Sequence, residues 1–241
     1  MRKSEIKFYS GIQGIEEAMP IIPTREYRHE WIKRARVKQD DNLKSITRCP
    51  GINGIMTTGW LVRSWLDIGL EIKGDEYGWQ TPLDQVALSN GLCQPVVGEH
   101  DEQHIYDNWE NYPKDTFKKI IKINTPWWVD IPKGYYLLQF HPSYLDDNRF
   151  TSCSGKYSRD GGLAAINVPM FWHSTEGEYL IKAGTPLAQL VLVKDEDIDF
   201  KNYYDGKYLR KTLNTHTILS WSRFKRSYGA IKDYYVRKDR K

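Results

Sequence analysis

The residues best suited to metal chemistry are two histidines placed four positions apart. His100 and His104 enclose Asp101 and Glu102 in the segment HDEQH. On a helix, both imidazoles would share one face and could ligate a divalent cation. The zincin pattern, however, requires Glu directly after the first His, and Asp101 stands there instead. We therefore favour a solvated polar loop and predict no metal site. His100 and His104 would be the candidate ligands if a cation did bind.

A nucleophile and its base could come from the second half of the chain. His141 and His173 lie at the ends of expected strands, and Cys153 lies in the loop between them. A thiolate nucleophile needs a base within hydrogen-bond reach and a third group that orients the base, and spacing shows neither. Ordinary, partly buried side chains are the favoured interpretation. These residues therefore favour a protein without catalytic activity and without a cofactor.

Asp160 belongs to a glycine-rich loop, SRDGG at 158–162, that could contact an anion through its backbone N–H groups. The loop has neither Walker nor Rossmann spacing, so a plain turn is the favoured interpretation.

The charge of the chain is unevenly distributed. Residues 206–241 hold eleven Lys and Arg against two Asp, a net charge of +9, although the whole chain carries only +4. Three scattered cysteines are too few for a disulfide scaffold, and no stretch approaches the roughly 18 apolar residues of a spanning helix. We therefore expect a protein without a membrane span that is cytosolic or is assembled from the cytosol.

The hydrophobic pattern of the body is typical of β-structure. Residues 57–82 alternate between apolar and polar around a turn at Lys73-Gly74-Asp75, which predicts a hairpin or meander. Nine Trp and sixteen Tyr favour strands and interfaces. The pattern predicts a mainly β fold, an antiparallel β-barrel or a sandwich of jelly-roll type. Further strands are expected at 5–9, 119–131, 135–141, 163–172, 178–182 and 187–193, with Pro132-Lys133-Gly134 as the turn between the second and third of these.

Helices are expected at both ends of the β body, which we place in a single domain of residues 1–205. Thr24 could cap an N-terminal helix over 25–38, and a short helix could form around 101–110. The extension at 206–241 predicts a basic amphipathic helix, whose apolar stripe consists of Ile218, Trp221, Phe224, Tyr228, Ile231 and Tyr235.

The C-terminal helix has three interpretations. Its stripe could dock on the body or on a partner subunit, its cations could neutralise phosphates of a nucleic acid, or it could lie on an acidic membrane surface. Docking is favoured, because large apolar side chains on one face are unfavourable in water. The partner-contacting residues would be Trp221, Phe224, Lys225, Arg226, Tyr228 and Tyr235.

Two stretches of the second half carry a resemblance to a known family. Ile131-Pro132-Lys133-Gly134-Tyr135-Tyr136 followed by Pro142-Ser143, and Lys182-Ala183-Gly184-Thr185-Pro186-Leu187-Ala188-Gln189-Leu190, resemble motifs of the dUTPase and dCTP-deaminase family. The resemblance implies a β-clip barrel, often trimeric, and nominates Ser143, Asp160 and Gln189 for a nucleotide pocket. The Arg of the family's Pro-Arg-Ser-Gly motif is missing, and its water-activating Asp has only Asp147 or Asp160 as a counterpart.

More of the chain resembles an uncharacterised family of tailed phages, notably phages of marine cyanobacteria. The similar stretches are IKFYS, PIIPTREYRHEWI, RCPGINGIMTTGWLVRSWLDIGLEI, KINTPWWVDIPKGYYLLQFHP and AGTPLAQLVLV. This resemblance implies a viral origin and an all-β body, and no activity. The main hypothesis is a noncatalytic virion or assembly component that contacts itself or other viral proteins, in the host cytoplasm during infection or in the virion. The alternatives are a nucleotide-binding or nucleotide-hydrolysing protein of the dUTPase-like class and a host-directed binding protein.

Overall fold

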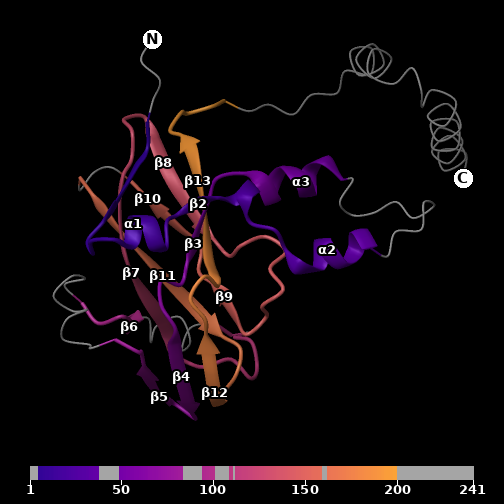
Figure 1. The fold of residues 1–241 in the computed structure, drawn as a ribbon, viewed down its shortest axis with the longest axis vertical. Helices are drawn as coiled ribbons and strands as arrows, with labels where there is room; N and C mark the ends of the chain where they lie inside the picture. Colours follow the sequence, from indigo (N-terminus) through magenta and orange to yellow (C-terminus); the bar gives the residue numbers. More distant parts are fainter. Residues whose placement is uncertain are drawn as a thin grey trace, which may run out of the picture. The chain divides into compact units, whose positions relative to one another are not determined.

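The computed structural model describes residues 5–37, 49–83, 94–100, 109–110, 112–158 and 162–199 (Figure 1). The chain divides into two units, Met1–Glu196 and Asp197–Lys241, and the elements below belong to the first. Several expectations fall outside the described residues: the C-terminal helix, Asp160, His104 and nearly all of the short helix around 101–110. His100 ends a strand, but its side chain is also outside the description.

The predicted mainly β, antiparallel fold is confirmed. In the first sheet, the long strand β7 (Ile120–Asp130) pairs along one edge with β11 (Ala164–Trp172), which pairs in turn with β9 (Phe150–Ser152). The other edge of β7 pairs with two short strands, β6 (Val97–His100) and β1 (Lys7–Ser10). β7 has neighbours on both edges and is largely buried, and its buried positions include the polar Asn124 and Thr125 beside apolar residues such as Ile121 and Trp127.

The second sheet has the order β10-β8-β13-β3-β2. Its strands are β10 (Gly155–Tyr157), β8 (Tyr135–Phe140), β13 (Pro186–Lys194), β3 (Trp60–Arg63) and β2 (Ile22–Pro23). The third sheet places β4 (Ile68–Lys73) between β12 (Glu176–Ile181) and β5 (Glu76–Gln80), so the predicted turn at Lys73-Gly74-Asp75 does close a hairpin. One hydrophobic core joins the three sheets through side chains such as Ile123, Val168, Leu137, Leu190 and Ile72.

Two of the expected strand–turn–strand units connect different sheets. Pro132-Lys133-Gly134 joins β7 to β8, which pair with other strands and not with each other. The turn at Lys182–Pro186 likewise leads from β12 in the third sheet to β13 in the second. These turns therefore move the chain between layers of the fold, because the strands they connect find their hydrogen-bond partners far away in the sequence.

The helical elements differ from the prediction. The expected helix over 25–38 is split into a 3-10 turn, η1 (Thr24–Glu26), and α2 (Glu30–Val37), because Tyr27 adopts an extended conformation between them. Thr24 does not act as the predicted cap, since its hydroxyl oxygen is buried without a hydrogen-bond partner among the described residues. Two helices were not expected: α1 (Ile15–Ala18) and α3 (Pro50–Thr57). In Figure 1, α2 and α3 lie on the same side of the sheets.

Candidate functional site

The two stretches that resemble the dUTPase family meet in the structure. The backbone N–H of Ser143 donates to Oε1 of Gln189 across 3.2 Å, although the residues are 46 positions apart. Nε2 of Gln189 donates to the carbonyl oxygens of Ile55 and Thr58, each at 2.8 Å. The Gln189 side chain is only 1% exposed. Its amide therefore ties β13 to the turn at Ser143-Tyr144 and to the end of α3, and both the oxygen and the nitrogen of the amide are engaged.

Gly59, which follows α3, brings this clamp close to β13. A Cβ atom at Gly59 would lie 1.9 Å from the carbonyl oxygen of Leu190, and the glycine has a positive φ of 76°. Its own carbonyl accepts a hydrogen bond of 2.9 Å from the N–H of Thr24. Only glycine allows both the left-handed conformation and this approach of two backbones. Gly59 thereby determines where the end of α3 meets the Gln189 amide.

A groove of about 670 Å³ lies beside this junction and is built from three segments. Tyr27, His29 and Glu30 come from the stretch that leads into α2, and Leu145–Asp147 come from the loop that follows Ser143. The third wall is the turn Lys182–Pro186. The groove thus lies next to both family-like stretches, while Ser143 and Gln189 themselves are not among its described lining residues.

The two aspartates of the groove are paired with arginines. Asp147 receives two side-chain hydrogen bonds from Arg149, from Nε to Oδ1 at 2.9 Å and from Nη2 to Oδ2 at 2.6 Å. Burial alone would raise the pKa of Asp147, but the hydrogen bonds and the positive charge of Arg149, together with His141, outweigh burial and hold that pKa below its ordinary value. Asp146 pairs with Arg34 of α2 at 3.1 Å. Both carboxylates are therefore directed to cations of the protein itself.

The backbone of the Lys182–Pro186 turn is also hydrogen-bonded within the protein. Ala183 N–H donates to Oδ1 of Asp67 at 2.7 Å, and Gly184 N–H donates to the carbonyl of Ser64 at 2.7 Å. Thr185 N–H closes the turn onto the Lys182 carbonyl at 3.0 Å. Consecutive N–H groups can form an anion-binding concavity, but here each already has an acceptor. The exposed ammonium group of Lys182 is the cation that this wall presents.

Tyr27 and His29 form an aromatic edge of the groove. Their rings meet edge to face with centroids 5.0 Å apart, and His29 is buried. Burial lowers the pKa of His29, and the opposing effect of Asp146 is smaller, so the imidazole is neutral at pH 7. Burial raises the pKa of the Tyr27 phenol, and the carboxylates of Asp146, Glu30 and Asp147 raise it further. The groove therefore presents a neutral imidazole and a protonated phenol.

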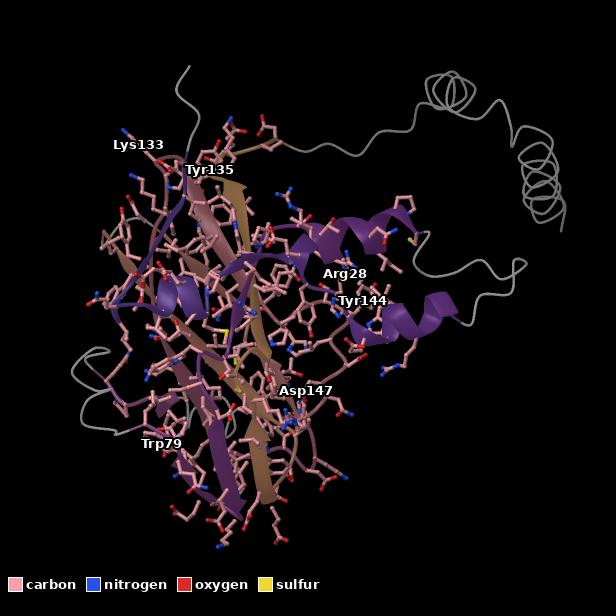
Figure 2. The ribbon with its side chains drawn as sticks, viewed as in Figure 1. Arg28, Trp79, Lys133, Tyr135, Tyr144 and Asp147 are labelled. Atoms are coloured by element: carbon pink, nitrogen blue, oxygen red, sulfur yellow. The ribbon has the colours of Figure 1, made fainter. Side chains whose placement is uncertain are left out.

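Tyr144 lies at the point where the 141–149 loop contacts α2, as Figure 2 shows. Its φ of 60° is in the left-handed region, which an aromatic residue adopts only with strain. The indole N–H of Trp31 donates to the Tyr144 carbonyl at 2.9 Å, and the ion pair between Arg34 and Asp146 lies beside it. These two links hold the loop, and with it the Asp146 wall of the groove, against α2.

The second pair of candidate histidines does not line the groove. Nδ1 of His141 accepts the backbone N–H of Ser152 at 3.2 Å, and the His173 ring lies between the hydroxyls of Thr116 and Thr151 at 3.3 and 2.7 Å. Burial lowers the pKa of both histidines. These bonds connect the loop at 141, β9 and the segment after β11, so both rings have structural hydrogen bonds. In the part of the chain that is described, no cluster of three or more His, Cys, Asp or Glu could hold a metal ion.

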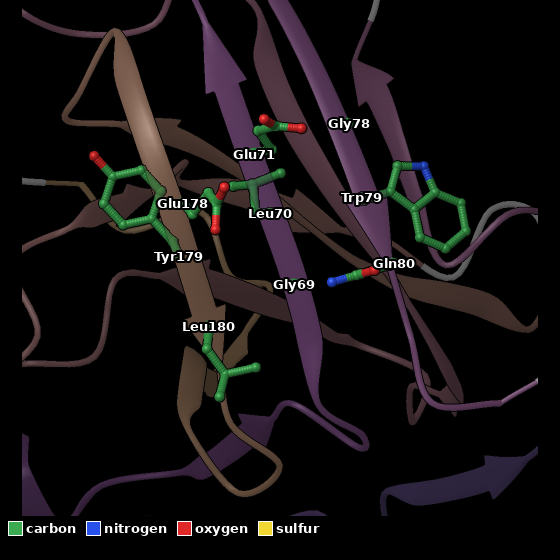
Figure 3. Close-up of a pocket in the computed structure, with 9 residues that line it drawn as sticks. All are labelled: Gly69, Leu70, Glu71, Gly78, Trp79, Gln80, Glu178, Tyr179 and Leu180. Atoms are coloured by element: carbon green, nitrogen blue, oxygen red, sulfur yellow. The ribbon is translucent and has the colours of Figure 1, made fainter.

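A second hollow lies on the outer face of the third sheet (Figure 3). Gly69 and Gly78 lack side chains there, which leaves a trough of about 580 Å³ beside Glu71 and Glu178. These two glutamates occupy directly opposite positions on β4 and β12, and Lys73 pairs with Glu71. The trough has two glutamates on its walls, and the Gln80 side chain lies against Gly69. Its β12 wall, Glu178–Leu180, directly precedes in sequence the second family-like stretch, which begins at Lys182.

Comparisons with known proteins give structural neighbours only, since neither a protein-family model nor a curated protein matches this chain. A point mutant of the dUTPase from phage phi11 of S. aureus is 13% identical with a TM-score of 0.38, covering 84% of this chain and 99% of that chain. A mutant of Staphylococcus bacteriophage 80alpha dUTPase with dUpNHpp is 13% identical with a TM-score of 0.39, covering 85% and 91%. At these values the similarity assigns neither a substrate nor a catalytic residue to this chain. The expected relationship to phages of marine cyanobacteria stays a prediction.

The sequence indicated part of this site. Ser143, Gln189 and Asp147 were candidates, and the structure places them at or beside the groove, whereas Asp160 lies outside the described residues. Tyr27, His29, Glu30 and Lys182 were not predicted as site residues. The many polar and aromatic residues of REYRHEW could have indicated a site in this segment. The predicted helix over 25–38, however, would distribute these side chains differently from the extended segment that is observed.

Proposed function

We propose that the protein binds a nucleotide, as a member of the dUTPase-like class, in the groove between Tyr27–Glu30, Leu145–Asp147 and Lys182–Pro186. The observation that carries the proposal is the hydrogen bond from Ser143 to Gln189, because it joins the two family-like stretches directly beside a groove. The groove volume of about 670 Å³ lies within the roughly 300–1,000 Å³ that small-molecule sites occupy.

The groove supports binding better than hydrolysis. Cleavage of a phosphoanhydride needs an activated water and cations that stabilise the developing negative charge. Asp147 is the aspartate of the groove that the family resemblance nominates for water activation, but its hydrogen bonds to Arg149 stabilise the ionised form and make it a weak base. Lys182 is the only Lys or Arg among the described lining residues. We therefore propose a binding protein, with hydrolysis as the activity to be assayed beside binding.

Ligand-dependent thermal stability tests the proposal. The full chain is heated with dUTP, dCTP, their monophosphates and ATP, with and without Mg²⁺, and a ligand that binds only the folded state raises the melting temperature. Lys182→Ala removes one charge-assisted contact and should weaken binding about tenfold. Lys133→Ala is the matched control, because Lys133 is equally exposed in a Pro-Lys-Gly turn at the other end of the body (Figure 2).

Two outcomes contradict the proposal. Absence of a melting shift with every deoxynucleotide, at millimolar ligand, rejects nucleotide binding. Equal loss of affinity in the Lys133 and Lys182 variants rejects the groove as the place of binding. Release of pyrophosphate or phosphate during incubation would keep the site and show that the groove also catalyses hydrolysis.

The virion or assembly role, the host-directed role and self-association stay predictions. No described helix is long and apolar enough to cross a membrane. The aromatic stripe and the nucleic-acid alternative both concern residues 206–241, outside the described part of the chain. Mass spectrometry of purified virions is the direct test of a structural role.

A further inference from the structure

We propose that His141 is a pH-sensitive clasp, whose neutral imidazole holds the base of the loop that forms one wall of the groove and whose protonation releases that base. The loop runs from His141, directly after β8, to Ser152 at the end of β9, and it contains the groove residues Leu145–Asp147. The clasp acts on the fold itself, so it operates whether or not the groove binds a nucleotide.

The clasp is a single hydrogen bond between the two ends of this loop. The backbone N–H of Ser152 donates to Nδ1 of His141 across 3.2 Å. Ser152 is 3% exposed and belongs to β9, the edge strand of the first sheet in the described part of the chain, whereas His141 follows a strand of the second sheet. The imidazole therefore supplies the acceptor for a buried N–H at a sheet edge, and it joins two sheets at the point where the loop begins and ends.

The donor determines which form of His141 can make this bond. A backbone N–H can only donate, so Nδ1 must carry a lone pair and the proton of the neutral ring must lie on Nε2. Protonation places a second proton on Nδ1, and two N–H groups then face each other. The bond is lost in the imidazolium, and the buried N–H of Ser152 is left without its acceptor, which is costly.

The neighbouring His173 responds differently because its partners are hydroxyl groups. Nδ1 lies 3.3 Å from the Thr116 hydroxyl, and Nε2 lies 2.7 Å from that of Thr151. A hydroxyl group can donate or accept, so both can accept from an imidazolium after their hydrogens rotate. Protonation of His173 therefore preserves its two contacts, whereas protonation of His141 breaks the contact to Ser152.

The surroundings of His141 set the direction of the pH response. Burial lowers its pKa below the ordinary 6.5, a charged His173 lowers it further, and the attraction of Asp147 opposes both without overcoming them. Asp147 is held in turn by Arg149, and the Phe150 ring meets the imidazole edge to face at 5.7 Å. The clasp is thus closed at pH 7. Its contribution to stability is complete above the unfolded pKa and is lost as the pH falls through the lower folded pKa.

Nuclear magnetic resonance of the isotope-labelled full chain between pH 7.5 and 5 tests the clasp. The ring-nitrogen shifts of His141 report its tautomer and its titration, and hydrogen exchange reports the protection of the Ser152 amide. We expect an unprotonated Nδ1 at pH 7.5. We also expect the Ser152 protection factor to fall about tenfold with the midpoint of the His141 titration, because leaving a buried donor without its acceptor has an effect of that size.

Two variants separate His141 from the other titrating groups. His141→Asn offers Oδ1 as an acceptor close to the position of Nδ1, and this acceptor does not titrate, so Ser152 should be equally protected at both ends of the pH range. His173→Gln is the matched control. It removes the like charge near His141, so the loss of Ser152 protection should persist with a slightly higher midpoint.

Three results would overturn the clasp: a proton on Nδ1 of His141 at pH 7.5, a Ser152 amide whose protection does not follow the His141 titration, or a pH dependence that persists in His141→Asn. If the Asn variant does not fold, the coincidence of the two midpoints in the unmodified chain decides between the outcomes.

Discussion

Replacing Gln189 with Leu tests whether this residue belongs to the fold or to a ligand site. The side chain makes three hydrogen bonds, at 3.2, 2.8 and 2.8 Å, and is 1% exposed. Leu leaves the Ser143 N–H and the Thr58 carbonyl without their partners, while the Ile55 carbonyl keeps a longer bond of 3.4 Å from the Thr58 N–H. At roughly 1–3 kcal/mol for each orphaned group, less the gain from a more apolar side chain, the expected loss is about 3 kcal/mol. For a chain of this size that loss lowers the melting temperature by roughly 6–12 °C.

The substitution Gln189→Glu separates hydrogen bonding from shape. The introduced carboxylate would face two carbonyl oxygens, so burial and repulsion would raise its pKa in the folded state above its unfolded value. The stability of this variant would then be greatest at acidic pH and would fall as the pH rises through the folded pKa. Thermal melts between pH 4 and 8, with exposed Gln80→Leu as control, check both variants. A Leu variant that melts within a degree of wild type, yet no longer binds nucleotide, would refute the clamp and assign Gln189 to the ligand.

The remaining predictions concern the backbone and the histidines. Gly59→Ala should cost about 3–5 kcal/mol in denaturant unfolding, because its Cβ would meet the Leu190 carbonyl at 1.9 Å in addition to the left-handed strain. Gly184 also has a positive φ, 87°, but a Cβ there would meet open space, so Gly184→Ala should cost about 1–2 kcal/mol. Equal losses in the two variants would contradict the packing argument. Urea unfolding at pH 7.5 and 5 should show lower stability at pH 5. Desolvation in the fold lowers the pKa of His29, His141 and His173 below their ordinary 6.5, so the unfolded chain takes up protons first as the pH falls. Constant stability would contradict a lowered pKa of these three histidines in the folded protein.

The strands could be predicted because their burial follows local alternation. Residues 68–73 alternate between buried and less buried positions, and the turn at Lys73-Gly74-Asp75 has a composition that closes a hairpin. Their partners could not be predicted, since β4 pairs on its other edge with β12, about a hundred residues further along the chain. The helix α3 was missed because Gly51 and Gly54 resemble a loop, although Ile52, Ile55 and Met56 do provide an apolar face at helical spacing.

The candidate site was predictable to the extent that it depends on motif residues. The family resemblance nominated Ser143 and Gln189 together, and they are in contact. Nothing local to β13 reveals that the amide is used by two carbonyls of the unexpected helix α3 and its C-terminal cap. The Tyr27–Glu30 wall forms because the helix is interrupted in a segment whose apolar residues have helical spacing. Burial of His29 and the hydrogen bond from Trp31 to Tyr144 outweigh the local helix propensity there.

Conversion of this groove into a hydrolytic site would require changes at both aspartates. Arg149 holds Asp147 with two hydrogen bonds, so the carboxylate cannot orient a water while the pair persists. Arg34 neutralises the charge of Asp146, so its guanidinium does not bind a phosphate. Opening the two pairs would supply a base and two cations together, because each arginine released is available to an anion. The Asp147 pair is the more buried and the better hydrogen-bonded of the two, whereas the Asp146 pair is exposed and contributes little to stability. A ligand with more negative charge than one phosphate would therefore pair with Arg34 before it pairs with Arg149. Asp147, the possible base, would be the last group to be released from its partner.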